Sequence, residues 1–199
     1  MKTVLLRGDY PRYPRLRQSG TCASAAKAGR LEETVFFKTN RLCILAAPGK
    51  RLNPHDVLSG LLDPAFRVAV ATPVAHPPGD YTWAMFRKAD AVQPGAFDIL
   101  SKKGLQILGP PCEDGDPLSV LGALQEGKAD VVVAYCSYGI HLPETLPGAT
   151  SQPFPAMLDV RSQYGIGATV GSPSQATQFI QLIRGKAGQS ILNLYGFGQ

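Results

Sequence analysis

Residues 127–137, GKADVVVAYCS, decide the fold class of this chain. The apolar run at 131–134 is continuous, which is typical of a strand in a parallel sheet that is covered on both faces. Upstream of it, the sequence predicts short strands at 67–71 and 105–108, with helical patterns between them. Residues 67–135 therefore follow the order strand, helix, helix, strand, helix, strand, and we predict an α/β architecture.

Capping residues predict where several helices begin. Asn53 and Asp116 each precede a proline, a combination that favours the start of a helix. Asp80 follows the turn at 77–79 and is interpreted as the cap of a further helix. The rest of the chain is predicted to form extended segments at 36–37 and 42–47, a strand at 164–170, and C-terminal helices from 173 and 187.

The composition is that of a folded globular protein. The 199 residues are 44% hydrophobic and 18% charged, which excludes wholesale disorder. No apolar run approaches the roughly 20 residues that cross a bilayer, so we expect a soluble chain. Twenty Lys and Arg against 15 Asp and Glu give a net charge of +5. No nucleic-acid-binding motif accompanies this charge, so nucleic acid is not an expected partner.

The cysteines and histidines predict neither a metal site nor an enzyme. Cys22, Cys43, Cys112 and Cys136 lie far apart without a Cys-x-x-Cys pair, so we interpret them as small hydrophobic residues with free thiols. The three histidines belong to no hydrolase or metalloprotease motif. His141 follows Cys136 closely, but a buried cysteine at a helix start is the commoner arrangement than a catalytic thiolate pair.

Hydroxyl-bearing residues follow the predicted strands of the central region, namely Thr72, Ser119, Tyr135 and Ser137. The carboxyl ends of parallel strands meet at one edge of a sheet, and helix N-termini direct N–H groups to the same edge. A small oxyanion bound there needs donors alone, which these residues supply. The alternative is that each of them caps a helix or is a core residue with a satisfied hydroxyl.

Short motifs recur in a characteristic order along residues 36–199. They are TNRL at 39–42, APG at 47–49, VAVATP at 68–73, PPGDY at 77–81, GKAD at 127–130, VAYCS at 133–137, GQSIL at 188–192 and YGF at 195–197. Their order and spacing resemble the periplasmic molybdate-binding proteins of ABC importers, which have the type II solute-binding fold. The resemblance implies two α/β lobes, joined by hinge strands, that close over a dehydrated oxyanion such as molybdate or tungstate. It implies no cofactor, a membrane permease as partner, and a periplasmic location.

The resemblance also implies a set of binding residues. The family's ligand-binding tyrosine falls on Tyr135, and its amide-donating Pro-Ala-Gly turn falls on 77–79, where Pro78 has no N–H. A second amide donor falls near Pro117, which also has no N–H. Neighbouring amides would replace both donors if the backbone shifts by one residue. Together with the hydroxyl-bearing residues at the strand ends, this gives the predicted ligand-binding residues Tyr135, Thr72, Ser119, Gly79 and Leu118.

The N-terminal part of the chain does not match the sequence pattern of the family. Roughly 60 residues of the first lobe have no counterpart, so the chain is interpreted as a truncated member with impaired binding. Residues 1–42 with 155–199 are predicted to form a partial first lobe, and 43–154 the second lobe with the hinge strands. An exposed sheet edge in the partial lobe predicts self-association. No signal-peptide pattern is present, so the location is cytoplasmic if the chain is complete as written.

Two other classes of function remain open. A cytoplasmic ligand-sensing domain of a transcription regulator has the same fold, about this length and no signal peptide. Residues 1–35, however, contain too many prolines and too little apolar periodicity for a helix-turn-helix. An enzyme on the same fold would need a clustered acid/base pair, which the sequence does not show.

Overall fold

The computed structural model describes residues 5–9, 32, 34–74, 77–108 and 119–198. The chain forms two compact units, unit 1 with residues 1–40 and 162–199 and unit 2 with residues 41–161. The elements are β1 (Leu5–Asp9), β2 (Val35–Ala46), α2 (Val57–Leu62), β3 (Val68–Ala71), α3 (Pro77–Val92), α4 (Ala96–Lys103), β4 (Leu105–Leu108), α5 (Val120–Gln125), β5 (Val131–Tyr135), α6 (Cys136–Gly139), α7 (Leu142–Thr145), β6 (Thr150–Pro153), β7 (Arg161–Gly167), α8 (Ser174–Arg184) and α9 (Lys186–Leu194).

The sheet of unit 2 has β5 near its centre, where the apolar run predicted a buried strand. Its strand order is β6-β2-β5-β3-β4. β5 pairs in parallel with β3, and β3 pairs in parallel with β4. β2 pairs antiparallel with both β5 and β6, so the sheet is mixed. The α/β class is confirmed, and the strands that were predicted between 67 and 135 form its parallel part.

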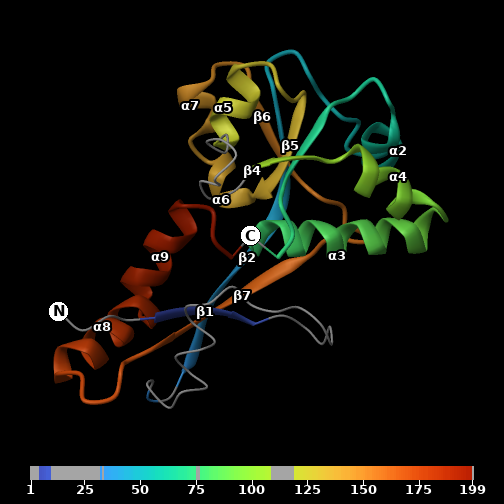
Figure 1. Ribbon diagram of the computed structural model, residues 1–199. Helices are drawn as coiled ribbons and strands as arrows, with labels where there is room; N and C mark the ends of the chain where they lie inside the picture. The colour runs from blue at the N-terminus through green and yellow to red at the C-terminus, as the bar shows by residue number, and fades with distance from the viewer. Residues whose placement is uncertain (1–4, 10–31, 33, 75–76, 109–118, 199) are drawn as a thin grey trace. The chain divides into compact units, whose positions relative to one another are not determined.

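Helices cover both faces of this sheet. Successive side chains of a strand point to opposite faces. Ala69 and Ala71 of β3 belong to a hydrophobic core that also contains Leu124 of α5. Val68 and Val70 point to the other face, where α3 contacts β3 and β5 (Figure 1). Both faces of the sheet are thus shielded from water. This explains why β3 is apolar at every position, and β5 at every position except the last, Tyr135.

Two local predictions need correction. Helix α2 begins later than predicted, because the cap is Asp56, whose Oδ1 accepts a hydrogen bond from the Ser59 N–H at 3.3 Å. Asn53 instead accepts from the His55 N–H in a turn. The two extended segments predicted at 36–37 and 42–47 are one strand, since β2 runs through the polar residues between them. Asp116 lies outside the described residues.

In unit 1, the C-terminal segment packs against β2. β7 lies between β1 and β2 in the strand order. The ring centroid of Tyr164 on β7 lies 6.2 Å from that of Phe37 and 5.7 Å from that of Phe197. Lys38 Nζ donates to Asn193 Oδ1 of α9 at 2.6 Å. These contacts join β2, β7 and the last residues of the chain into one unit.

The two C-terminal helices are amphipathic, as their spacing predicted, but their apolar faces are exposed. No residue of α8 is buried, and Gly188 is the buried residue of α9. Five large side chains of these helices and the turn after them are 46% to 72% exposed: Phe179, Leu182, Ile191, Leu194 and Tyr195. Self-association through an exposed sheet edge of this unit stays a prediction.

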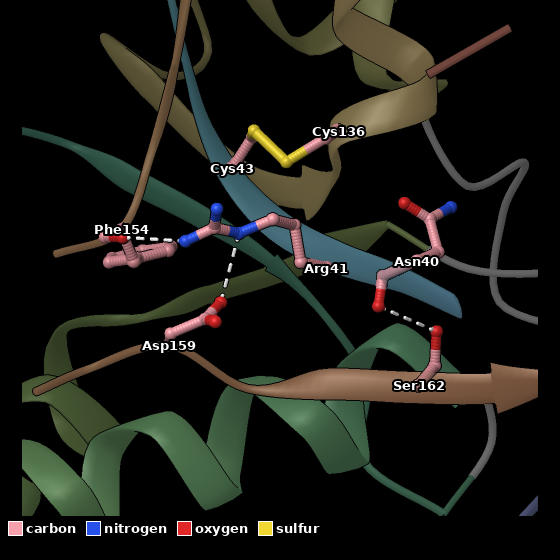
Figure 2. Close-up of a disulfide and its surroundings, with 7 residues drawn as sticks. All are labelled: Asn40, Arg41, Cys43, Cys136, Phe154, Asp159 and Ser162. Atoms are coloured by element: carbon pink, nitrogen blue, oxygen red, sulfur yellow. Dashed lines mark hydrogen bonds and ion pairs between the residues drawn. A yellow bond between two sulfur atoms is a disulfide. The ribbon is translucent and has the colours of Figure 1, made fainter. Parts of the chain in front are cut away.

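The unit boundary falls inside two strands, between Asn40 and Arg41 in β2 and between Arg161 and Ser162 in β7. On the unit 2 side, Asp159 accepts from Arg41 Nε at 3.0 Å and from Arg161 Nε at 2.8 Å. On the unit 1 side, the Ser162 hydroxyl donates to the carbonyl oxygen of Asn40 at 3.2 Å (Figure 2). Each unit therefore holds its own ends of both strands together.

Candidate functional site

Thr72 and Gly79 lie against each other at the carboxyl end of β3. The Thr72 N–H donates to the Leu108 carbonyl at 3.2 Å, and its hydroxyl lies 3.5 Å from the Gln106 carbonyl oxygen. Helix α3 begins at Pro77 and brings Gly79 very close to this strand end. A Cβ on Gly79 would lie 2.5 Å from the carbonyl carbon and oxygen of Thr72. No residue other than glycine fits this approach without a backbone shift.

Replacing Gly79 by alanine is therefore expected to lower the free energy of unfolding by about 1 to 3 kcal/mol, as overpacking does. The added methyl group meets backbone atoms, which cannot turn aside. Gly60→Ala in α2 is the matched control, because its Cβ would meet the terminal methyl carbon Cδ2 of Leu52 at 2.7 Å, and a methyl group can move. Urea unfolding measures both variants, and equal losses would contradict the tight contact at Gly79.

The first turn of α3 can present two backbone amides. The first N–H groups of a helix have no carbonyl of the same helix to pair with. Pro77 and Pro78 carry no N–H, so the amides of Gly79 and Asp80 are the ones that remain. A helix N-terminus attracts negative charge. The helix start that replaces the family's Pro-Ala-Gly turn therefore still contains amide donors, displaced from the position of Pro78.

Asp80 is not the helix cap that the sequence predicted. Helix α3 begins three residues earlier, and Asp80 lies in its first turn. Its Oδ1 accepts a hydrogen bond from the Val74 N–H at 2.8 Å. Burial raises the pKa of Asp80, and the bond from Val74 acts in the opposite direction. Val74 has φ 68°, which is a rare and strained conformation for a β-branched residue. The carboxylate of Asp80 thus holds a strained loop beside Thr72.

Tyr135 ends β5 and is the N-cap residue of α6. It is partly buried, and it lies opposite Leu42 of β2 in the ladder. Its ring centroid is 6.1 Å from that of Tyr81, which is buried on α3 two residues after Gly79. The first turns of α3 thus contact the ends of both β3 and β5. The structure brings Thr72, Gly79 and Tyr135 into one region of unit 2.

Ser119 caps a helix, which was the alternative to anion binding in the sequence analysis. It is the N-cap of α5, and its hydroxyl oxygen accepts from the Gly122 N–H at 2.9 Å. This bond uses an acceptor lone pair and leaves the hydroxyl proton to donate elsewhere. Leu118 and Pro117 lie outside the described residues. Ser137 lies in α6, two residues after Tyr135.

Cys43 and Cys136 form a disulfide, so the prediction of free thiols is wrong for this pair (Figure 2). Their Cα atoms are 4.8 Å apart, although 93 positions separate them in sequence. Cys43 lies opposite Ala134, the residue before Tyr135, and Cys136 is the residue after Tyr135, so the disulfide runs diagonally across the end of the ladder. The antiparallel register decides this proximity, and residue spacing gives no sign of it. Cys22 and Cys112 lie outside the described residues.

Asp130 of the GKAD motif has a structural role that the sequence analysis missed. Its carboxylate is buried and accepts from the backbone N–H of Arg67 at 2.9 Å, and from Arg67 Nε at 3.1 Å and Nη2 at 3.0 Å. Lys50 Nζ lies 3.2 Å from Oδ1. The side-chain hydrogen bond from Arg67 is the main reason why the pKa of Asp130 is well below its usual range. This carboxylate joins the start of β3 to the start of β5.

The described residues include no group of three or more His, Cys, Asp or Glu side chains that could hold a metal ion. The sulfur of Cys136 is bonded to Cys43, so it cannot act as a thiolate with His141 in this state. His141 Nδ1 lies 3.1 Å from Glu144 Oε2 in an exposed pair at the start of α7.

Among the described residues, no helix has both the length and the apolarity to span a bilayer.

A relative in Pasteurella multocida shares part of the chain. The uncharacterized protein PM1146 is 33% identical over 110 residues, which is 53% of this chain and 45% of the relative. The matched part thus spans less than half of that protein's length. Its name states no ligand.

Solved structures with low sequence identity share the fold. The sulfate-binding protein SubI from Mycobacterium tuberculosis H37Rv has a TM-score of 0.67 at 16% identity, over 88% of this chain and 64% of its own. The periplasmic molybdate-binding protein of Azotobacter vinelandii has a TM-score of 0.62 at 18% identity, over 89% and 73%. A periplasmic thiamin-binding protein has a TM-score of 0.61 at 19% identity, over 86% and 60%. These similarities confirm the type II periplasmic-binding-protein fold.

Most of the described structure falls within one family's pattern. Residues 16–198 match the family described as bacterial extracellular solute-binding protein. This match covers more than half of the chain, and it includes all of unit 2 and every strand from β2 to β7. The chain belongs to the bacterial extracellular solute-binding protein family.

Proposed function

We propose that this chain binds a small tetrahedral oxyanion of the molybdate or tungstate type as the solute-binding component of an ABC importer. The observation that carries the proposal is the meeting of Thr72, Gly79 and Tyr135 around the first turns of α3. These residues offer two hydroxyls and a backbone amide, so they can donate hydrogen bonds to an anion without a metal counter-ion. The Thr72 hydroxyl is available for this, because 3.5 Å is long for its bond to Gln106.

The similar structures include proteins named for oxyanions and one named for an organic solute. Two of them are named for sulfate and molybdate, and a third is named for thiamin, so the fold admits different solutes. The chemistry of unit 2 favours the oxyanions, because its gathered groups include hydroxyl and amide donors. The importer's membrane permease is the proposed partner of the chain.

The disulfide supports a periplasmic location. Disulfides persist in oxidising compartments and are rare in the cytosol. Cys43 and Cys136 are each 3% exposed and are bonded in the structure. This observation favours an importer component over the cytoplasmic ligand-sensing domain, which has the same fold.

Thermal unfolding with single ligands tests the proposal directly. The ligands are sodium molybdate, tungstate, sulfate and phosphate, with thiamin as an organic cation for comparison. An oxyanion at 100 times its Kd adds about 2.7 kcal/mol, which raises Tm by about 5 to 11 °C in a chain of this size. If no oxyanion raises Tm at millimolar concentration, the proposed ligand class is wrong.

Tyr135→Phe is expected to weaken oxyanion binding roughly 10- to 100-fold. A hydrogen bond to a charged group contributes about 1.5 to 3 kcal/mol, and phenylalanine keeps the ring contact with Tyr81 while it removes the donor. Tyr138→Phe removes the hydroxyl of an exposed tyrosine three positions further on and serves as the control. Isothermal titration calorimetry measures both affinities. Unchanged affinity in Tyr135→Phe would exclude this hydroxyl from the site.

A further inference from the structure

The Cys43–Cys136 disulfide directly adjoins the tyrosine that is proposed to bind the anion. Cys136 is the next residue after Tyr135, and Cys43 is the next residue after Leu42. Leu42 and Tyr135 are themselves opposite each other in the β2–β5 ladder. The disulfide thus closes a short ring around the last pair of this ladder, and Tyr135 lies within that ring.

The helix that follows Tyr135 is short. Tyr135 has φ −64° and ψ 141°, an extended conformation from which the chain turns into α6. Helix α6 has four residues, and no side chain caps its start. A helix of this length has almost no stability of its own, because forming the first turn is unfavourable. Tertiary contacts therefore hold this helix: Gly139 packs against Ser151 at its end, and the disulfide holds Cys136 at its first residue, next to Tyr135.

We propose that the disulfide is a positioning element for Tyr135, which fixes the backbone from which the phenol ring projects. This inference rests on the proposed function, in which the Tyr135 hydroxyl donates to the ligand. Both cysteines are buried, whereas Tyr135 is partly exposed, so the fixed point lies in the core and the positioned group lies at the surface. The ring of Tyr81 lies beside the oriented ring, at a centroid distance of 6.1 Å.

The proposal predicts that the disulfide affects affinity through Tyr135 alone. Cys43→Ser/Cys136→Ser is expected to weaken oxyanion binding roughly 2- to 10-fold, which corresponds to the ordering of one side chain on binding. In the Tyr135→Phe background, the same pair of substitutions is expected to change affinity no further. Titration calorimetry well below every Tm supplies the four affinities. Equal weakening in both backgrounds would show a general structural effect and would overturn the proposal.

A core variant separates positioning from loss of stability. Leu124 on α5 is 4% exposed and belongs to the same hydrophobic core as the two cysteines. Leu124→Ala is expected to destabilise the fold and to leave affinity unchanged, because it does not alter the backbone at Tyr135. If Leu124→Ala weakens binding as much as removal of the disulfide does, positioning by the disulfide is contradicted.

A ligand-free measurement distinguishes this proposal from the proposed function. In protein labelled with 3-fluorotyrosine, the Tyr135 resonance is assigned through its loss in Tyr135→Phe. Removal of the disulfide is expected to shift or broaden this fluorine resonance and to leave that of Tyr164 in unit 1 unchanged. An unmoved Tyr135 resonance overturns the positioning proposal. A moved resonance in a protein that binds no oxyanion supports positioning and refutes the proposed ligand.

Discussion

Asp130→Ala is expected to lower the free energy of unfolding by about 3 kcal/mol. The carboxylate is 3% exposed and accepts hydrogen bonds from the backbone and the guanidinium of Arg67, and it pairs with Lys50. Its removal leaves the backbone N–H of Arg67 without this acceptor between two strands. The loss lies at the low end for a buried ion pair, because the side chains of Arg67 and Lys50 are about half exposed. Urea unfolding at neutral pH measures it.

The effect of Asp130 is expected to depend on pH in a defined direction. The folded state lowers the pKa of this carboxyl, so its stabilisation is present above the ordinary aspartate pKa of about 3.9 and is lost as pH falls below it. The difference in stability between the wild type and Asp130→Asn should therefore shrink from about pH 5 toward pH 2. A constant difference over this interval would contradict the ion-pair explanation. Burial raises the pKa of Asp80, so Asp80 has the opposite effect on the pH dependence of stability. Wild type and Asp130→Asn share this effect, so it cancels in their difference.

Loss of the Cys43–Cys136 disulfide is expected to reduce stability by about 4 kcal/mol. The bond joins residues 93 positions apart, and a crosslink across so long a segment strongly restricts the unfolded chain. Urea unfolding of Cys43→Ser/Cys136→Ser against the oxidised wild type gives the difference. The wild type unfolded and refolded with excess dithiothreitol is expected to match the variant. A reduced wild type as stable as the oxidised protein would show that the crosslink contributes nothing.

A separate experiment tests whether Cys43 pairs with Cys136. Digestion of the oxidised protein without a reductant is expected to yield one linked peptide pair that contains Cys43 and Cys136. Mass spectrometry detects that pair and its separation by dithiothreitol. Free alkylated Cys43, or a link from it to Cys22 or Cys112, would contradict the structure.

Local patterns predicted the elements of this chain well where hydrophobicity decided them. The apolar run at 131–134 predicted β5, and the spacing at 173–183 predicted α8. Polar and capping signals were less reliable. Asn53 and Asp80 both resemble helix caps, but Asp56 caps α2, and α3 begins before Asp80 because two prolines favour its first positions. Several nearby residues could cap a given helix, and the free energies of these alternatives differ little. Packing around the helix start therefore decides which residue becomes the cap.

The sequence likewise predicted some residues of the candidate site but not the contacts between them. The order of strands and helices predicts that Thr72 and Tyr135 lie at the carboxyl ends of strands. That these two strands are neighbours is decided by the sheet pairing. Their relation to Gly79 and Tyr81 needed the packing of α3 against both strands. Two roles were predicted for Ser119, an anion donor and a helix cap, and the structure shows that it caps α5.

The sequence alone determined the α/β class, the family's motif order and the identity of the residues that end β3 and β5. These properties follow from hydrophobic period and from neighbours along the chain, which a linear sequence contains. Tertiary structure alone decided that Cys43 meets Cys136, that Asp130 holds Arg67, and that Gly79 touches Thr72. Each of these contacts joins segments whose approach depends on strand register or helix packing, and a shift of one residue in register would abolish it.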